Sequence, residues 1–433
     1  MYVHALYETI PRELLSLLLL GRELRSRGVT YEVEQLKLAS NRFGKVANPK
    51  LRIVPFCYNE SNMRHSISKA RWSGEAALNM CWEQFCPAWL RDHFLPEQIV
   101  GQSMCFVSWG SFYASLLEEK GIAKENIFVT GNVRMDLAKH ENLLFGRDFL
   151  AKTFQLNADK PWILIAWNLN LGNQKGENHT QQVCQKYGMD FPQEYFDTLT
   201  NTREAHLKYC ADIAKAFPNH EVILRAHPSG NDAQELKENI GDKHNNVHAI
   251  PDLDIISWIT QSESVVSFSS TAMIEAIAAG VPTLSYEPYP FFKNFGYDVG
   301  YIPPVVNTVD EAISLLQTPQ KLQSMINWDE YEKWYGKPDH KAHVRLADAC
   351  IHILNNVDKF RFPAEIARKS SLVKNKTRRL IQNHPTLKPF LSWLGHGTKK
   401  RMKEKQWIPM KALDDVIDGA HISRLYPWVS KLK

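Results

Sequence analysis

Cysteine is scarce in this sequence and never occurs in a paired motif. The seven cysteines are scattered over 433 residues, and no two of them form a CxxC pair. A disulfide framework and a thiolate zinc site both need clustered cysteines, so both are disfavoured. We expect reduced and mostly buried thiols.

Long apolar runs are missing as well. The longest run near the start, LLSLLLLG at residues 14–21, has charged residues on both sides. A membrane span needs about 20 apolar residues, so this run predicts a buried helix. The opening residues MYVHALYE alternate as a strand does and do not resemble a cleavable leader. We therefore expect a cytoplasmic protein.

Internal repeats and low-complexity tracts are also absent, and the composition is that of a globular protein. Hydrophobic residues make up 44% and charged residues 23% of the chain, which is close to the average of folded domains. A chain of 433 residues exceeds what one hydrophobic core usually serves. Two domains are therefore expected.

The net charge of +5 is concentrated near the C-terminus. Residues 368–405 contain twelve lysines and arginines and one acid, Glu404, so the rest of the chain is net acidic. Because aliphatic and aromatic residues intersperse this segment, it has two alternative interpretations: a surface that rests on an anionic membrane leaflet, or a solvated or locally packed helix. A nucleic-acid partner is not expected, since no nucleic-acid motif accompanies the charge.

Strand and helix patterns alternate over about the first 340 residues. The strand pattern YVHALYE precedes the helix pattern PRELLSLLLLGRELRSRG, and MCFVSWG precedes SFYASLLEEKG. The rhythm restarts at WILIAWN, a strand apolar enough to be buried on both faces of a sheet. This alternation predicts an α/β fold with two Rossmann-like, doubly wound parallel-sheet domains that face a cleft.

The domain boundaries follow from the same patterns. Polar loop residues before WILIAWN place the boundary near Lys160. We predict a first domain over 1–158 and a second over 159–340. A helix within 341–367 is expected to pack back on the first domain, and 368–433 forms the basic C-terminal extension.

Small polar residues gather where one strand of the second domain is expected to end. In VVSFSSTAMIEAIAAG a buried strand is followed at once by a helix, with Ser269, Ser270 or Thr271 as its cap. The free N–H groups and positive dipole end of a helix start favour a phosphate. One turn later, Glu275 is placed to accept hydrogen bonds from ribose hydroxyls. A plain helix cap is the alternative.

A second group of candidate residues lies in ILRAHPSGND, at the end of another strand pattern. The candidates are Arg225, His227 and Pro228, and the proline fixes the backbone where the histidine turns into the cleft. A histidine there can donate a hydrogen bond or a charge to a leaving phosphate. A structural histidine is the alternative.

Two further loops hold candidate donor-binding residues. Asn168, Gly172 and Asn173 follow the WILIAW strand, where polar, glycine-containing loops approach phosphates or simply form turns. Arg134, in TGNVRMD at the domain junction, is a candidate phosphate or carboxylate ligand. A hinge ion pair is an equal alternative for Arg134.

Carboxylates of the first domain are the candidates for a general base. Glu8 follows the first strand, and Glu83 lies in NMCWEQF. A capping or ion-paired role is the alternative for each. No DxD motif is present, so no metal ligand is assigned.

The motifs together resemble a known family. The segments YETIPRELLSLLLLGRELRSRG, CWEQF, VTGNVRMD, ILRAHPSGND and SSTAMIEAIAAGVPTLSYEP are similar to those of bacterial surface carbohydrate biosynthesis proteins, which act in capsule and lipopolysaccharide synthesis. An HP pair followed by paired hydroxyl residues is distantly similar to bacterial sialyltransferases and CDP-glycerol glycerophosphotransferases. The resemblance implies a GT-B-type glycosyltransferase, with the acceptor domain first and the nucleotide-sugar donor domain second.

The resemblance also implies roles for residues and a donor class. In the similar families, the histidine of the HP pair assists departure of the donor phosphate and the hydroxyl residues bind phosphate, which here means His227 with Ser269, Ser270 and Thr271. The implied reaction moves a CMP-linked nonulosonate or Kdo-type sugar to a lipid-linked surface polysaccharide or lipopolysaccharide, without a metal or other cofactor. The acidic pair before a glycine that marks the sialyltransferase base is missing, and Ser267 stands where retaining enzymes carry the first of two glutamates.

Three alternatives remain open. One is a CDP-glycerol-type glycerophosphotransferase, and another is a nucleotide-sugar 2-epimerase, which shares the twin sheets and an HP pair. The third is an inactive scaffold in polysaccharide assembly. The expected location is the cytoplasm, with the inner face of the cytoplasmic membrane as the partner surface of the basic extension.

Overall fold

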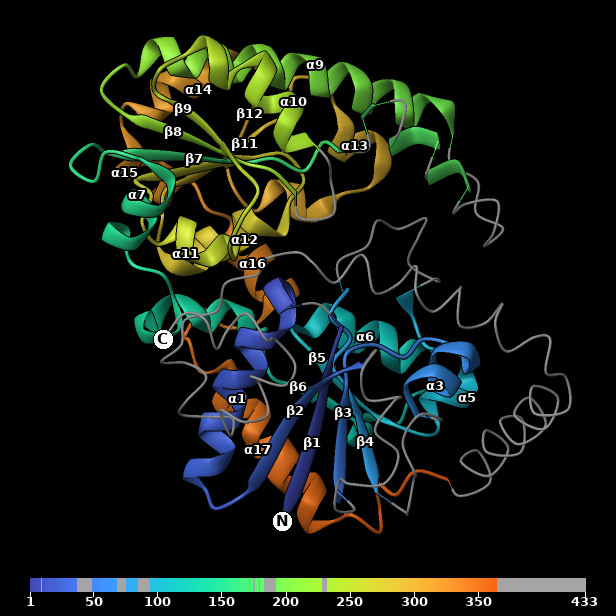
Figure 1. Cartoon of the computed structure of the whole chain (residues 1–433). Coiled ribbons are helices and arrows are strands. Elements are labelled where there is room, and N and C mark those ends of the chain that lie inside the picture. The colour runs from blue at the N-terminus through green and yellow to red at the C-terminus, as the bar shows by residue number, and fades with distance from the viewer. Residues whose placement is uncertain are drawn as a thin grey trace, which may run out of the picture.

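The chain forms two α/β domains, each built on a six-stranded parallel sheet (Figure 1). The computed structural model describes residues 1–363 except 9, 37–48, 68–74, 85–93, 171, 174–175, 179, 183–191 and 228–231. Pro228 and the basic extension over 368–433 lie outside the described residues. The predicted fold class, with two doubly wound domains, is confirmed.

The sheet of the first domain has the strand order β2-β1-β3-β4-β5-β6. Val3 of β1 lies opposite Tyr31 in β2 on one side and Leu51 in β3 on the other. The sheet therefore grows outward from β1 in both directions, and the strand order reverses between β1 and β3. The strands are β1 (Tyr2–Tyr7), β2 (Thr30–Gln35), β3 (Leu51–Val54), β4 (Ala76–Asn79), β5 (Cys105–Ser108) and β6 (Ile127–Val129). A doubly wound sheet places ligands beyond the carboxyl ends of such strands.

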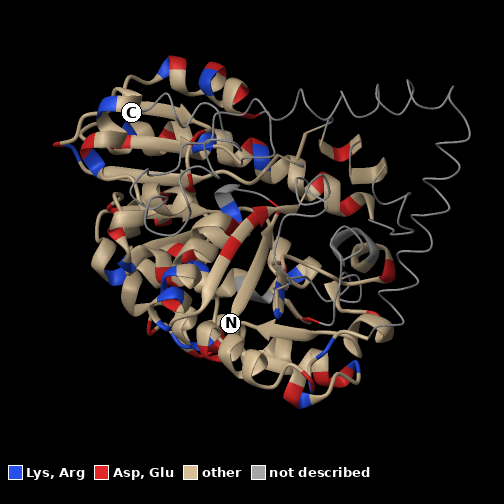
Figure 2. Cartoon of the chain, turned by 60° about the horizontal axis from the view of Figure 1, so that its bottom comes forward, with Lys and Arg blue, Asp and Glu red and all other residues tan. Residues whose placement is uncertain are grey.

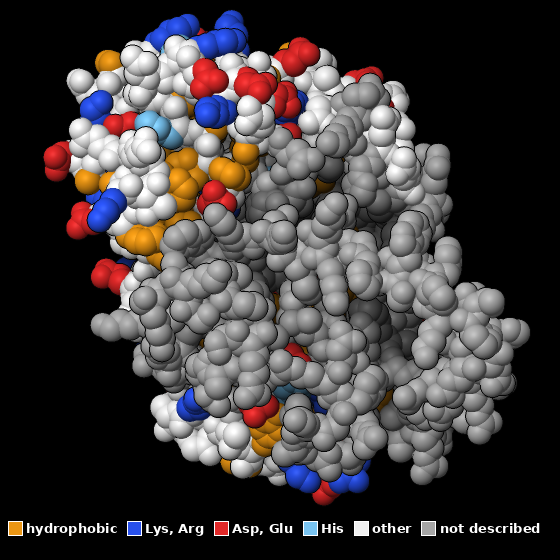
Figure 3. Space-filling model, in the orientation of Figure 1, with side chains coloured by type: hydrophobic (Ala, Val, Ile, Leu, Met, Phe, Trp, Pro, Cys, Tyr) orange, Lys and Arg blue, Asp and Glu red, His pale blue; other side chains and the backbone are white. Residues whose placement is uncertain are grey.

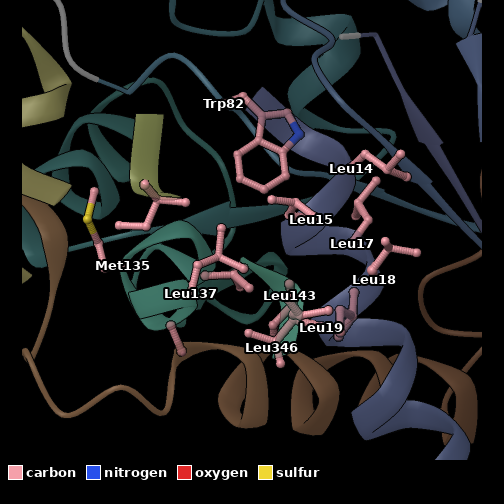
Figure 4. Packing of buried hydrophobic residues seen from close by; sticks show 14 of the residues in the cluster. Leu14, Leu15, Leu17, Leu18, Leu19, Trp82, Met135, Leu137, Leu143 and Leu346 are labelled. Carbon is pink, nitrogen blue, oxygen red and sulfur yellow. The ribbon is translucent and has the colours of Figure 1, made fainter. Parts of the chain in front are cut away.

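The helices of the first domain begin with the leucine-rich run. Its residues are buried in α1, as predicted, and Figure 4 shows Leu15 and Leu19 on the side of the helix that faces Leu137 and Leu346. The helical elements are η1 (Ile10–Leu14), α1 (Leu15–Ser26), α3 (Glu60–Ile67), α5 (Gln98–Gly101), α6 (Ser111–Glu119), η3 (Lys124–Asn126), η4 (Val133–Lys139) and η5 (Glu141–Leu143). η1 is a π-helical turn, a local form that often occurs at functional sites.

The sheet of the second domain has the order β12-β11-β10-β7-β8-β9 and reverses between β7 and β10. All five residues of β7 are buried, as expected for a strand covered on both faces. The strands are β7 (Trp162–Ala166), β8 (Glu221–Arg225), β9 (Val247–Ile250), β10 (Ser264–Ser267), β11 (Thr283–Tyr286) and β12 (Val305–Val306).

Helices cover both faces of the second sheet (Figure 1). They are α7 (Arg147–Phe154), α9 (Gln193–Ala216), α10 (Asp232–Asn239), η6 (Gly241–Lys243), α11 (Ile255–Ile259), α12 (Thr271–Ala279), α13 (Phe291–Phe295), η7 (Asp298–Tyr301), α14 (Val309–Leu316) and α15 (Pro319–Ser324). Within the described ranges, no helix is long and apolar enough to cross a membrane.

The chain then returns to the first domain through α16 (Trp328–Tyr335) and α17 (Ala342–Asn355). The ring of Trp334 lies 4.2 Å from that of Phe112 in α6, and α17 packs along α1 (Figure 4). Gly110 permits this contact, because a Cβ atom there would lie 2.2 Å from the carbonyl oxygen of Lys333. The two domains are therefore tied together twice, before α7 and at α16.

The described surface carries charges of both signs. In the cartoon of Figure 2, basic and acidic residues intermingle along the helices. In Figure 3, hydrophobic side chains gather on the second domain close to the boundary with the first. Phe149 of α7 is one of the exposed hydrophobic residues.

Candidate functional site

A cavity of about 270 Å³ lies between the domains, where the carboxyl ends of both sheets meet. Loops after β1, β4, β5 and β6 form its first wall, and loops after β7, β8, β9 and β10 form its second. The lining residues are Arg12, Glu13, Trp82, Glu83, Trp109, Asn132, Arg134, Met135, Ala166, Trp167, Arg225, Ala226, His227, Leu253, Ile255, Ser270, Thr271, Ala272 and Glu275. The cavity therefore unites seven predicted site residues with others that the sequence analysis did not single out.

The start of α12 opens into this cavity. Ser270 caps the helix, because its Oγ accepts a hydrogen bond from the N–H of Ala272 at 3.2 Å. Ser269 has a left-handed φ of 46°, and its carbonyl accepts a hydrogen bond of 2.9 Å from the Asn168 side chain. Ser270 and Thr271 line the cavity, whereas Ser269 and Asn168 shape the turn behind them. The positive end of a capped helix thus faces the cavity.

An ion pair joins the two domains at the cavity wall. Arg134 of η4 contacts Glu275 of α12, with Nε 2.7 Å from Oε1. The side chain of Asn132 accepts a hydrogen bond of 3.0 Å from the backbone N–H of Arg134. The Nη1 of Arg134 donates to the carbonyl of Arg12 at 2.6 Å. Glu275 is 2% exposed, and its Oε2 has no hydrogen-bond partner among the described residues. That oxygen is an acceptor for a ligand hydroxyl.

His227 directly follows β8 and borders the cavity with an exposed side chain. Partial desolvation is the largest cause that lowers the pKa of His227 to about 4, and the positive charges of Arg12 and Arg225 lower it further. The imidazole is therefore neutral near pH 7 and can donate one hydrogen bond. A bound anion opposes the effect of the two arginines, so it raises the pKa of His227.

Arg225 holds the backbone of the second wall. Its guanidinium donates to the carbonyl of Ala226 and, at 2.6 Å, to that of Leu253. Leu253 has a left-handed φ of 70°, and both it and Ile255 line the cavity. Burial lowers the pKa of Arg225 to about 10, so the side chain stays charged at neutral pH.

Two carboxylates of the first domain reach the cavity. One is Glu83, which forms an ion pair with Arg12. The other is Glu13, which sequence reasoning missed; its Oε2 accepts the backbone N–H of Glu8 at 2.6 Å. Glu8 is not among the lining residues. The position of Glu13 two residues after Pro11, beyond the first strand, was the available signal.

Three tryptophans of the lining were also missed. Trp82, Trp109 and Trp167 each follow a strand of a parallel sheet. The Trp167 Nε1 donates to Asp232 at 2.9 Å, and the ring of Trp109 stacks on Tyr335 at 5.6 Å. The segments VSWG and IAWN place two of these tryptophans at predicted strand ends, and the carboxyl ends of parallel strands border the cleft.

All three predicted donor residues after β7 lie outside the cavity lining: Asn168, described above, Gly172 and Asn173. A Cβ atom on Gly172 would lie 2.6 Å from the carbonyl oxygen of Leu199, so this glycine allows close packing against α9. Asn173 accepts the backbone N–H of Gly176 at 2.8 Å and contacts Asp232 at 3.4 Å. In the residues that can be described, no group of three or more His, Cys, Asp or Glu side chains is arranged to hold a metal ion.

Comparisons with known proteins define the class of fold. No protein-family model matches the chain, and no curated protein sequence matches it. Solved structures do match, and they identify the architecture as a GT-B-like fold of two Rossmann-like domains. At identities of 16% and below, the likeness is one of fold.

Three of these structures illustrate the match. A putative UDP-N-acetylglucosamine 2-epimerase from Listeria monocytogenes has a TM-score of 0.55 and 16% identity over 82% of this chain and 97% of its own. The UDP-GlcNAc 2-epimerase from Neisseria meningitidis bound to UDP-GlcNAc has a TM-score of 0.52 and 13% identity over 81% and 100%. The H548A variant of the wall teichoic acid polymerase TagF has a TM-score of 0.50 and 10% identity over 82% and 89%.

Proposed function

We propose that the protein is a glycosyltransferase that binds a nucleotide-activated sugar in the cavity between its domains. The observation that carries the proposal is the convergence of His227 and the capped start of α12 on one wall with the carboxylate of Glu83 on the other. Phosphate, leaving group and proton each have a chemically suitable group nearby.

The donor occupies the second-domain wall in this proposal. Its phosphates lie against the N–H groups at the start of α12, where Ser270 and Thr271 add hydroxyls. The free Oε2 of Glu275 accepts a hydrogen bond from a ribose hydroxyl. His227 donates a hydrogen bond to the phosphate oxygen that leaves with the bonding electrons, and this interaction strengthens as negative charge develops.

The acceptor occupies the first-domain wall. Its hydroxyl oxygen attacks the anomeric carbon and gives its proton to a carboxylate. Glu83 suits this role better than Glu8, because Glu83 lines the cavity and Glu8 does not. The reaction uses the nucleotide sugar as its substrate and no further cofactor.

The donor and the acceptor follow from the family resemblance. We propose a CMP-linked nonulosonate or Kdo-type sugar as the donor, and a lipid-linked capsule polysaccharide or lipopolysaccharide as the acceptor. The protein then works in the cytoplasm at the inner face of the cytoplasmic membrane, with residues 368–405 on the anionic leaflet.

Calorimetric titration with CMP, CDP, UDP and GDP and their sugar conjugates tests this proposal. We expect cytidine nucleotides to bind and His227→Ala to lower turnover about a hundredfold or more while changing donor affinity less. The absence of binding and turnover with every donor would disprove it.

A nucleotide-sugar 2-epimerase is the second candidate. This chain covers 97% and 100% of the two epimerase structures named above, so nearly all of each has a structural counterpart here. Product analysis without an acceptor separates the candidates, because an epimerase converts the donor alone. CDP-glycerol, included as a donor, tests the related glycerophosphotransferase reaction.

A further inference from the structure

Arg12 and Glu83 form an accessible ion pair on the first-domain wall of the cavity. Their side chains are 48% and 44% exposed, whereas those of Arg134 and Glu275 are 14% and 2% exposed. Both side chains reach the cavity from separate loops, after β1 and β4. A ligand that enters the cavity can therefore contact the Arg12–Glu83 pair without any movement of buried side chains.

The backbone that carries Arg12 is fixed, although its side chain is accessible. The carbonyl of Arg12 accepts a hydrogen bond from Arg134 Nη1 at 2.6 Å. Next to it, the carboxylate of Glu13 accepts the N–H of Glu8 at 2.6 Å. The planar guanidinium is pre-organised, so it loses less conformational entropy per hydrogen bond than a lysine ammonium when it binds a ligand.

Arg12 and His227 line the cavity from opposite walls. The charge of Arg12 is the second cause, after desolvation, of the low pKa of His227. A guanidinium and an imidazole N–H both donate hydrogen bonds to an anion. The cavity thus offers an anion a contact from each domain.

We propose that Arg12 binds an anionic group of the substrate and that Glu83 holds Arg12 until this anion arrives. The anion is either the phosphate of the donor or the carboxylate of a sugar acid, and the guanidinium binds both by the same paired hydrogen bonds. Once Arg12 turns to the anion, the carboxylate of Glu83 is free. This inference rests on the proposed glycosyl transfer.

The released Glu83 then accepts the proton of the acceptor hydroxyl. The acceptor oxygen forms a bond to the anomeric carbon, and the bond from that carbon to the phosphate oxygen breaks with its electrons going to the phosphate. Proton removal thus becomes available only when the anionic donor is in place.

Two single variants of the pair distinguish this role from a structural one, because they change affinity in opposite directions. Glu83→Gln removes the competitor for Arg12, so CMP should bind about 1.4- to 5-fold more tightly, the range expected for an exposed ion pair. Arg12→Gln removes the anion ligand, so CMP should bind about 10- to 150-fold more weakly. Turnover should fall about a hundredfold or more in Glu83→Gln despite its tighter binding.

The matched control is an exposed pair away from the cavity lining. Arg361 contacts Asp358 at 2.6 Å, and their side chains are 55% and 93% exposed. Arg361→Gln and Asp358→Asn should leave CMP affinity unchanged. Thermal melting of all four variants identifies any that fail to fold.

The full chain is titrated with CMP, cytidine, a free nonulosonate and inorganic pyrophosphate. Loss of CMP binding in Arg12→Gln with cytidine unaffected identifies the phosphate as the anion, whereas loss of nonulosonate binding identifies the sugar carboxylate. Equal affinities for both CMP and the nonulosonate in wild type, Arg12→Gln and Glu83→Gln, or weaker binding in both variants, would overturn the inference and leave the proposed function standing. If the wild type binds no nucleotide, the proposed function fails. The inference fails as well if the wild type binds neither pyrophosphate nor the nonulosonate, or if Arg12→Gln leaves that binding unchanged.

Discussion

Individual residues of the cavity differ in how well their sequence context revealed them. His227, Ser270 and Thr271 lie at strand ends next to a helix start or a proline, and such local patterns place a side chain in a cleft. Arg12 and Glu13 lie in a π-helical turn that no local pattern distinguishes from the start of α1. The contacts of Arg12 with Arg134 and Glu83 join segments that are far apart in sequence, which periodicity cannot predict.

His206 gives a pH dependence of stability that is independent of the site. The side chain is 2% exposed and its Nε2 contacts the carbonyl of Tyr286 at 2.9 Å. Burial lowers its pKa from 6.5 to about 4. As the pH falls, the unfolded chain therefore binds a proton at His206 before the folded chain does. The stability that neutral, buried His206 contributes above pH 6.5 is lost as the pH falls towards 4.

The expected loss from His206 between pH 7 and pH 5 is about 2 kcal/mol of unfolding free energy. Urea unfolding of the wild type and of His206→Gln at both pH values measures this loss. The unfolding free energy of the wild type should fall more between pH 7 and pH 5 than that of the variant. Equal pH dependence in the two proteins would show that His206 does not titrate in this way.

Single elements show how local chemistry serves both fold and site. Ser270 caps α12 at the cavity, and Thr308 caps α14 with its side chain accepting from the N–H of Glu311. Thr308 is not among the cavity residues. The alternation of strands and helices was enough to predict both sheets, because buried strands and amphipathic helices have distinct periods. Strand order was beyond prediction, since it depends on long-range pairing.

Ser270→Ala and Thr308→Ala should each lower the unfolding free energy by about 0.5 to 2 kcal/mol, the usual effect of losing a helix cap. We expect only Ser270→Ala to weaken nucleotide binding as well. Denaturant unfolding and calorimetry of the two variants provide the comparison, and equal effects on binding would argue against a phosphate site at α12.

The docking of α16 on the first domain depends on Gly110. Gly110→Ala should cost about 1 to 3 kcal/mol, because the added Cβ would overlap the carbonyl of Lys333 at 2.2 Å. Gly241→Ala is the control, since its nearest atom would lie 3.7 Å away. A stability of Gly110→Ala as high as that of Gly241→Ala would contradict this packing.

At the scale of the whole molecule, the relation between the domains could not be predicted from the sequence. The Arg134–Glu275 pair crosses from one domain to the other, and it was predicted only as one of two alternatives for Arg134. The crossing before α7 and the return through α16 bring the two sheets together with their carboxyl ends facing. The cavity is a product of that arrangement.

Removal of one partner from this interdomain pair should be costly. Arg134→Met leaves Glu275 buried without its cation and should lower the unfolding free energy by about 3 to 5 kcal/mol. Arg134→Met with Glu275→Leu should recover part of that loss, because no charge then remains buried. A double-mutant cycle measures the coupling, and strictly additive losses would show that the pair does not link the domains.

We propose that a nucleotide sugar binds where the carboxyl ends of the two sheets meet. Hydrogen–deuterium exchange of the full chain, with and without a saturating cytidine nucleotide, tests it most directly. We expect slower exchange at the start of α12 and in the loop after β8, with the start of α14 unchanged. A nucleotide that binds without protecting α12 would contradict it.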